Sequence, residues 1–178
     1  MMPIYYKPAE VAGLVLRLCD QIQQAFPDHP SLNIVGIRSR GQTLADRLAT
    51  CLAERGFADI GRGVLDITLY RDDLSEVGPK PMVRPTDITI DINDKPLLLV
   101  DDVLFTGRSV RAALDALSDF GRPSAIRLAV LVDRAGRELP IQADFSALTL
   151  GDVPPSQRVN VRFMENDGKD EIVVEPRQ

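Results

Sequence analysis

Two adjacent carboxylates, Asp101 and Asp102, directly follow the wholly apolar run of residues 97–100. Such a run is typical of a buried parallel strand, and doubly wound sheets bind ligands at the carboxyl ends of their strands. Carboxylates placed there can accept hydrogen bonds from vicinal hydroxyl groups, or help to hold a divalent cation that grips those hydroxyls. Mg²⁺ is the favoured ion because it keeps several water ligands and is often shared with substrate phosphates. The pair therefore predicts a ligand with a polyhydroxyl ring.

The residues after the pair predict an anion site. Thr106, Gly107, Arg108 and Ser109 stand where a helix is expected to begin, and the start of a helix offers unpaired N–H groups and the positive end of its dipole. Gly107 lets the backbone approach a phosphate closely, while the hydroxyls add donors and Arg108 adds charge. The alternative remains open that the two aspartates only start a turn and that Ser109 only caps a helix.

The rest of the chain alternates between strands and helices, which predicts an α/β fold. Helices are expected around residues 11–22, 44–52 and 110–120, with Gly121 as a left-handed cap, and strands around 32–37, 65–70, 97–100 and 125–132. Alternating apolar residues indicate further strands around 88–92, 159–163 and 172–174. We find no repeat and no low-complexity block, so one domain is expected.

Residues 71–87 form a long segment without periodicity that contains Gly78, Pro79, Pro81 and Pro85. A segment of this length inside one domain is more often a functional lid than a plain connection. The alternative is a solvated surface connection.

Composition excludes several classes of protein. The chain has 178 residues, with 26 acidic against 21 basic side chains and a formal charge of −5. This balance argues against a generally basic protein that coats nucleic acid, although it leaves room for a local basic patch. No apolar run approaches the roughly 18 residues of a membrane-spanning helix, and the first residues have no apolar signal core, so we expect a cytoplasmic protein without a membrane partner.

The cysteines at positions 19 and 51 and the single histidine, His29, are too few and too far apart for most chemistry of these residue types. A zinc site, a histidine-dependent triad and a disulfide framework are all poorly supported. Both cysteines fall in helical patterns beside leucines, where we expect buried free thiols.

The string of residues 101–107, Asp-Asp-Val-Leu-Phe-Thr-Gly, resembles the phosphoribosyl pyrophosphate (PRPP) signature of type I phosphoribosyltransferases. Residues 35–41, 66–74, 131–134 and 137–141 together resemble the family of pyrimidine operon attenuation proteins/uracil phosphoribosyltransferases. The match runs from about residue 32 to 144, with four motifs in the family's order. It implies the type I fold: a central, mostly parallel sheet flanked by helices, with a flexible flap at about 71–87 and a small hood at about 134–178, within one domain of residues 1–178.

The resemblance also implies an activity, the transfer of phosphoribose from PRPP to uracil, which gives UMP and pyrophosphate. Such a step needs positioning and electrostatic stabilisation more than proton transfer, which is consistent with a site that lacks histidine. A lid is needed because water would hydrolyse the activated sugar. A third possibility, beside this activity and the RNA-binding regulator discussed below, is an enzyme of the same fold that acts on a purine.

The resemblance further leads us to expect roles for individual residues. Asp101 and Asp102 hold the ribose hydroxyls directly or through Mg²⁺, and Arg71 begins the catalytic flap. Ser39 and Arg40 bind pyrophosphate, in a turn of residues 38–41 that often has a non-proline cis peptide in type I enzymes. Val103, Leu104, Phe105, Thr106, Gly107, Arg108 and Ser109 bind PRPP or UMP and cradle the 5′-phosphate. Val132, Asp133 and Arg134 form the uracil pocket, with backbone groups at the uracil edge.

The family's second activity is nucleotide-dependent binding of the pyrimidine operon mRNA leader, which regulates transcription, and here the sequence departs from the pattern. Asp20 and Gly136 stand where the family usually has histidine, and Gln142 stands where a basic residue is common. Seven arginines remain that could face RNA, namely Arg17, Arg47, Arg55, Arg62, Arg127, Arg134 and Arg137. The alternative function is therefore an RNA-binding attenuation regulator with little or no transferase activity. The family also leads us to expect a homo-oligomer.

Overall fold

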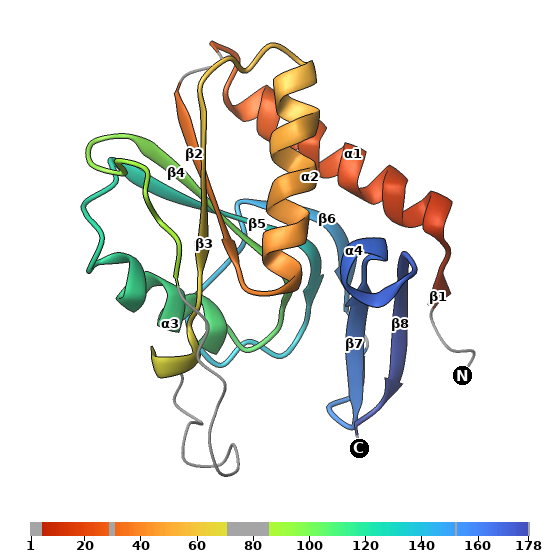
Figure 1. Cartoon of the computed structure of the whole chain (residues 1–178). Coiled ribbons are helices and arrows are strands. Elements are labelled where there is room, and N and C mark those ends of the chain that lie inside the picture. Colours follow the sequence, from red (N-terminus) through yellow and green to blue (C-terminus); the bar gives the residue numbers. More distant parts are fainter. Residues whose placement is uncertain (1–4, 29–30, 71–85, 152, 178) are drawn as a thin grey trace.

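The computed structural model describes residues 5–28, 31–70, 86–151 and 153–177. Its described part contains two sheets (Figure 1). The elements follow in the order β1 (Tyr5–Tyr6), α1 (Pro8–Ala25), β2 (Leu32–Ile37), α2 (Arg40–Glu54), β3 (Ile60–Leu65), a 3₁₀ turn (Thr68–Tyr70), β4 (Pro96–Leu104), α3 (Arg108–Leu117), β5 (Ala125–Arg134), β6 (Phe145–Leu150), β7 (Gln157–Arg162), α4 (Met164–Asp167) and β8 (Glu171–Pro176).

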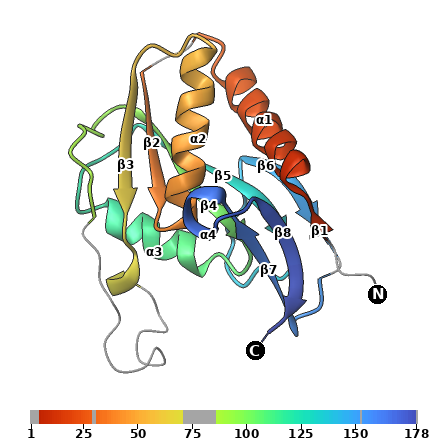
Figure 2. The same cartoon turned by 45° about the vertical axis from the view of Figure 1, so that its right-hand side comes forward.

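The central sheet has five parallel strands in the order β3-β2-β4-β5-β6. Helices α1 and α2 cover one face, and α3 covers the other (Figures 1 and 2). Strand β2 is buried along its whole length and β4 over residues 97–101, as expected for parallel strands covered on both faces. The predicted α/β class and mostly parallel sheet are confirmed.

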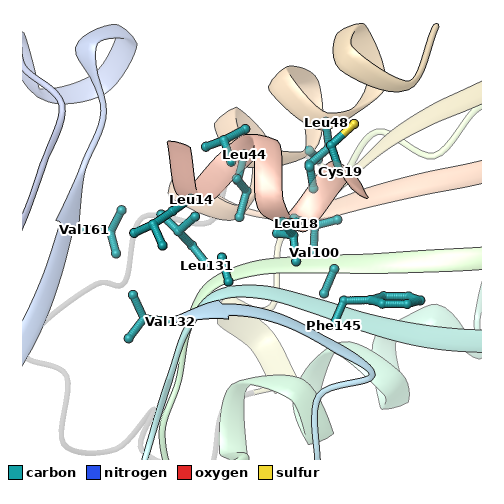
Figure 3. Close-up of a cluster of buried hydrophobic side chains, with 14 of the residues drawn as sticks. Leu14, Leu18, Cys19, Leu44, Leu48, Val100, Leu131, Val132, Phe145 and Val161 are labelled. Atoms are coloured by element: carbon teal, nitrogen blue, oxygen red, sulfur yellow. The ribbon is translucent and has the colours of Figure 1, made fainter. Parts of the chain in front are cut away.

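The first two helices form where apolar residues recur every three or four positions. In α1, Val11, Leu18 and Ile22 are fully buried, and the helix ends at Ala25, shortly before Pro27. Leu44 and Leu48 of α2 pack with them above the sheet in the cluster of Figure 3.

Both cysteines are free and lie in these helices. Cys19 lies inside the same buried cluster (Figure 3), and burial raises the pKa of its thiol to about 12. Its thiolate is therefore scarce at neutral pH, and the expectation of a buried thiol at position 19 is confirmed, whereas Cys51 is half-buried.

The strand expected around residues 65–70 lies earlier in the chain, at Ile60–Leu65. It ends because Asp66 turns the chain: its Oδ1 accepts hydrogen bonds from the backbone N–H and the hydroxyl of Thr68, at 2.8 and 2.5 Å. The two glycines Gly61 and Gly63 lie inside β3 rather than before a strand. A Cβ on Gly61 would lie 2.1 Å from the side-chain oxygen of Asn33 in β2.

The alternation of Ile88, Ile90 and Ile92 does not form a strand. Only the bridge between Val64 and Asp87 pairs this segment with β3. The isoleucines instead pack against the core beneath α3, while Asn33 donates to the carbonyl of Asp91. Periodicity therefore identified the buried side chains but not the backbone pairing.

Helix α3 is shorter than predicted, and β6 was not predicted. The helix ends at Leu117, and Phe120 lies exposed in the following turn, so its apolar character did not extend the helix. Gly121, at φ +149°, does not cap the helix. It lets the chain approach Asn93, whose side-chain oxygen accepts the N–H of Arg122 at 2.8 Å.

The second sheet is antiparallel, with the order β1-β8-β7 (Figure 2). The region 134–178, expected as a hood, is thus divided, because β6 completes the central sheet while β7, α4 and β8 belong to the second one. The latter also takes β1 from the N-terminal end of the chain. The alternating residues Val159, Val161, Ile172 and Val174 are buried between this sheet and α1.

We predict that Gly36→Ala lowers the free energy of unfolding by about 1–3 kcal/mol, because the new Cβ would lie 2.5 Å from the Cα of Gln42 in α2. Urea denaturation measures the change. The matched control is Gly13→Ala in α1, where nothing lies within 4 Å of the added Cβ; this variant should be stabilised by about 0.5–1 kcal/mol. Equal effects in the two variants would contradict the close approach of β2 and α2.

Candidate functional site

The acidic pair lies towards the carboxyl end of β4, at the carboxyl edge of the central sheet. Asp101 is 8% exposed, and its Oδ1 accepts the backbone N–H of Asp102 at 3.0 Å. Burial raises the pKa of Asp101 well above its usual range, and the neighbouring charge of Asp102 raises it further. Burial raises the pKa of Asp102 as well, although Arg40 partly offsets this effect. A nearby cation or nearby hydroxyl donors would stabilise the ionised form of two carboxyl groups in this position.

The turn before α2 lies directly against this pair. The Arg38–Ser39 peptide is cis, which locates the cis bond expected within residues 38–41. A Cβ on Gly41 would lie 2.6 Å from the carbonyl oxygen of Val100 and 3.1 Å from the Cα of Asp101. Glycine at position 41 is therefore what allows the first turn of α2 to reach β4.

Of the two residues expected to bind pyrophosphate, Ser39 is exposed at the N-cap of α2, and Arg40 follows it. The guanidinium of Arg40 makes two hydrogen bonds to Asp167 in α4, from Nε at 3.2 Å and from Nη2 at 2.7 Å. Arg40 also lines the same cavity as Asp102. The turn and the acidic pair therefore share one site.

A second turn, between β4 and α3, lies beside the pair. Gly107 has φ +92° and packs against Leu139 and Ile141, so that an added Cβ would lie 3.3 Å from the Cβ of Ile141. The carbonyl of Thr106 accepts the N–H groups of Glu138 and Leu139 at 3.0 and 3.2 Å. Residues 138–141 thus hold this loop in place.

The polar side chains of that loop have different surroundings. Thr106 Oγ1 accepts the backbone N–H of Arg108 at 3.3 Å, whereas the Arg108 guanidinium binds Glu138 at 2.7 Å. Ser109 is exposed in the first turn of α3. Leu104 is buried in the core, and Val103 lines the cavity.

The ring of Phe105, in the same loop, packs against two arginine side chains. The guanidinium carbons of Arg134 and Arg177 lie 3.9 and 5.2 Å from the centre of its ring. Gly136 has φ +117°, and a Cβ there would lie 2.3 Å from the ring of Phe105. A glycine in place of the family's usual histidine is thus what leaves room for the ring in this chain.

The three residues expected to form the uracil pocket lie in different surroundings. Val132 is fully buried in the core (Figure 3), and Asp133 binds Arg137 at 2.6 Å. Arg134 lines the cavity, is 2% exposed, and donates to the carbonyls of Gln157 and Val153 at 3.0 and 3.2 Å. Burial and the nearby charge of Arg177 lower the pKa of Arg134. No carboxylate among the described residues pairs with Arg134 to offset this effect.

A cavity of about 910 Å³ lies between the carboxyl ends of β4 and β5 and the β7–β8 hairpin. Its charged lining is mainly cationic: Arg40, Arg134, Arg158, Arg162 and Arg177, against Asp102 and Glu175. Sequence reasoning missed Arg158, Asn160 and Arg162. The signal was present, because Val159 and Val161 alternate with them, so one face of β7 is buried and the other carries these polar groups.

Two further expectations concern the flap and the metal. Arg71 and the flap as far as residue 85 lie outside the described residues. Among the residues that are described, no group of three or more histidine, cysteine, aspartate or glutamate side chains could hold a metal ion. Any cation at the acidic pair would therefore need oxygens of a substrate or of water in addition to those of Asp101 and Asp102.

Comparison with known proteins assigns the chain to a family. The model of the phosphoribosyl transferase domain matches residues 5–163. The protein named "Bifunctional protein PyrR" from Chloroflexus aurantiacus is 52% identical over 93% of this chain and 90% of its own length. The protein of the same name from Thermus thermophilus is 48% identical over 95% of this chain and 93% of its own. This chain belongs to the PyrR family of phosphoribosyltransferases.

Solved structures agree on the fold. Hypoxanthine phosphoribosyltransferase of Trypanosoma cruzi has a TM-score of 0.71 at 16% identity, over 97% of this chain and 95% of that one. The purine phosphoribosyltransferase of Pyrococcus horikoshii has a TM-score of 0.57 at 23% identity, over 78% and 81%. The expected type I fold is therefore confirmed for this PyrR-family chain. Within the described residues, no helix is long and apolar enough to cross a membrane.

The arginines that could face RNA all have partners within this PyrR-family chain. Arg47, Arg55, Arg127 and Arg137 bind carboxylates at 2.5–2.9 Å, and Arg62 lies 3.9 Å from one. Arg17 donates to the carbonyl of Ala147 at 3.1 Å, and Arg134 is buried. Most of these charges are thus partly neutralised by the protein itself.

We predict that Asp101→Asn raises the stability of the folded protein at pH 7. The folded-state pKa of Asp101 lies above its unfolded value, so ionised Asp101 destabilises the fold above that raised pKa. The gain should shrink as the pH falls towards the unfolded value, because the wild-type carboxyl then becomes protonated. Denaturation with urea at pH 7 and pH 5 measures it; a variant less stable than wild type at pH 7 would contradict a strained acidic pair.

Proposed function

We propose that this protein transfers phosphoribose from PRPP to uracil and so forms UMP and pyrophosphate. The observation that carries the proposal is the pair of buried Asp101 and half-buried Asp102, which lies between two turns that open helices, with Asp102 in the cavity lining. The turn before α2 is suited to pyrophosphate, and the loop before α3 is suited to the 5′-phosphate. The pair between them is suited to the ribose hydroxyls.

The chemistry fits this distribution. As the C1–oxygen bond to pyrophosphate breaks, positive charge develops on the ribose, and the electron pair leaves with the pyrophosphate. N1 of uracil then forms the new bond to C1 and its proton passes to solvent. Asp101 and Asp102 stabilise the developing positive charge, while Arg40 stabilises the negative charge on the leaving group.

Mg²⁺ fits the donor set at this site. Carboxylate oxygens are the ligands that it prefers, and a nearby cation would offset the cost of burying the ionised groups, which raises both pKa values. Asp101 and Asp102 would hold it together with oxygens of PRPP. When bound, the ion neutralises part of the charge on the pyrophosphate.

The base is proposed to lie in the arginine-lined cavity rather than on the backbone of β5. Val132 and Asp133 are paired with β4 on one side and β6 on the other, so their backbone groups are largely committed. Uracil presents two carbonyl acceptors and an N3–H donor. Arg158 and Arg177 can donate to the carbonyls, and the amide of Asn160, whose Nδ2 donates to Glu175, keeps its oxygen for N3–H.

The deciding experiment measures UMP formation from uracil and PRPP with Mg²⁺, with hypoxanthine and guanine as competing bases. Formation of UMP, undiminished by the purines, supports the proposal. Use of a purine in place of uracil would favour the purine enzymes that share this fold, and no transfer to any base would overturn it. We propose that the protein acts in the cytoplasm.

We predict that Asp101→Asn, although more stable, lowers turnover by about tenfold or more, because an amide cannot stabilise the positive charge of the transition state as a carboxylate does. Steady-state kinetics at saturating PRPP and Mg²⁺ measure the change. Turnover close to that of wild type would remove the acidic pair from the mechanism.

We further predict that Arg177→Gln raises the KM for uracil by roughly tenfold and leaves the KM for PRPP nearly unchanged, because one charged hydrogen bond to the base is lost. Arg127→Gln is the matched control, since Arg127 is exposed and binds Asp144 at 2.9 Å at the far end of β5. If both variants behave like wild type, the base lies elsewhere.

A second function is favoured by the bifunctional relatives, namely nucleotide-dependent binding of a pyrimidine operon mRNA leader. Filter binding with and without UMP over a salt series tests it. Because the candidate arginines are largely paired, we expect a shallow dependence of affinity on salt. A steep dependence would indicate that RNA displaces these pairs, and no binding at any salt concentration would exclude the regulator.

Sedimentation in the same buffers tests the expected homo-oligomer.

A further inference from the structure

Asp167 fixes the orientation of Arg40. The pair is bidentate, and the side chains of Asp167 and Arg40 are 16% and 36% exposed, so the carboxylate is shielded while the guanidinium remains accessible. This contact lowers the pKa of Asp167 and raises that of Arg40. Both groups are therefore charged throughout the neutral range.

The carboxylate of Asp167 is itself held from behind. Its Oδ2 also accepts the backbone N–H of Phe163 at 3.0 Å, and the ring of Phe163 is fully buried. The neighbouring Asn166 accepts the hydroxyl of Thr43, one turn after Arg40 in α2. Asp167 is therefore held in place by contacts that do not involve Arg40.

The geometry leaves one edge of the guanidinium for a ligand. Asp167 occupies Nε and one N–H of Nη2, so the donors of Nη1 and the outer N–H of Nη2 remain. Arg40 lines the cavity beside Asp102, whereas Asp167 is not part of the cavity lining. We propose that Asp167 is a positioning residue that directs the Nη1 edge of Arg40 towards pyrophosphate. This inference rests on the proposed function.

The test is the binding of magnesium pyrophosphate to Asp167→Asn, measured by calorimetry. The amide keeps one acceptor but loses the charge and the second acceptor, so Arg40 is released to several rotamers. We expect affinity for pyrophosphate to fall by roughly tenfold and the KM for PRPP to rise to a similar degree, with a smaller change in kcat. Asp167→Glu, which keeps the charge, should recover part of the loss.

Asp170→Asn is the matched control. Asp170 lies three residues later, binds Arg47 at 2.8 Å and accepts the N–H of Met164 at 2.7 Å, without contact to Arg40. Its substitution should lower thermal stability while leaving pyrophosphate affinity unchanged. If it weakens pyrophosphate binding as much as Asp167→Asn does, the effect is structural and the inference is wrong.

A double-mutant cycle with Arg40→Gln decides whether Asp167 acts through Arg40. In the Arg40→Gln background, Asp167→Asn should have no further effect on pyrophosphate affinity. Additive losses would overturn the inference, as would wild-type affinity in Asp167→Asn. Wild-type protein that neither binds pyrophosphate nor forms UMP would overturn the proposed function instead, so the two failures are distinguishable.

Discussion

The arrangement of the site depends on two adjacent carboxyl groups near the end of β4, buried Asp101 and half-buried Asp102. Burial raises the pKa of both groups, and the charge of Asp102 raises that of Asp101 further, so ionisation of the pair is costly. The surrounding structure tolerates this cost because Gly41 brings the first turn of α2, with Arg40, against them. A stability cost at one position is typical of sites where the charge of a bound ligand offsets the charge of the protein.

The second sheet contributes to the site through polar contacts with α2. Residues 40, 43 and 47 of that helix recur at three and four positions and meet α4 and the residues after it through three ion pairs and a hydroxyl hydrogen bond. The opposite face of the helix packs into the core. Helix α2 thus connects the hydrophobic core, the turn of residues 38–41 and the small sheet, so displacement of α4 would change the direction of Arg40.

How much of the fold and of the site could be predicted from the sequence depended on how far apart the interacting residues lie along the chain. Local patterns predicted β2, α1, α2 and the turn between β4 and α3, because the burial pattern and the glycines of these segments can be recognised from neighbouring residues. They did not predict β3, whose glycines hide its apolar pattern, nor the end of α3, where Phe120 is exposed. The partners of Arg40 and Arg134 lie 127 and 19–23 residues away, and only the folded chain brings them together.

The pairing of arginines with carboxylates also affects the proposed binding of RNA. An arginine already bound to a carboxylate must lose that partner before it can neutralise a phosphate, so its net contribution to RNA affinity is smaller than its charge suggests. Arg158 and Arg177 have no carboxylate partner among the described residues, and both line the cavity. Among the described residues, these two arginines therefore add positive charge to the cavity that no carboxylate of the protein pairs with, which is the charge that the proposed nucleotide ligand would meet.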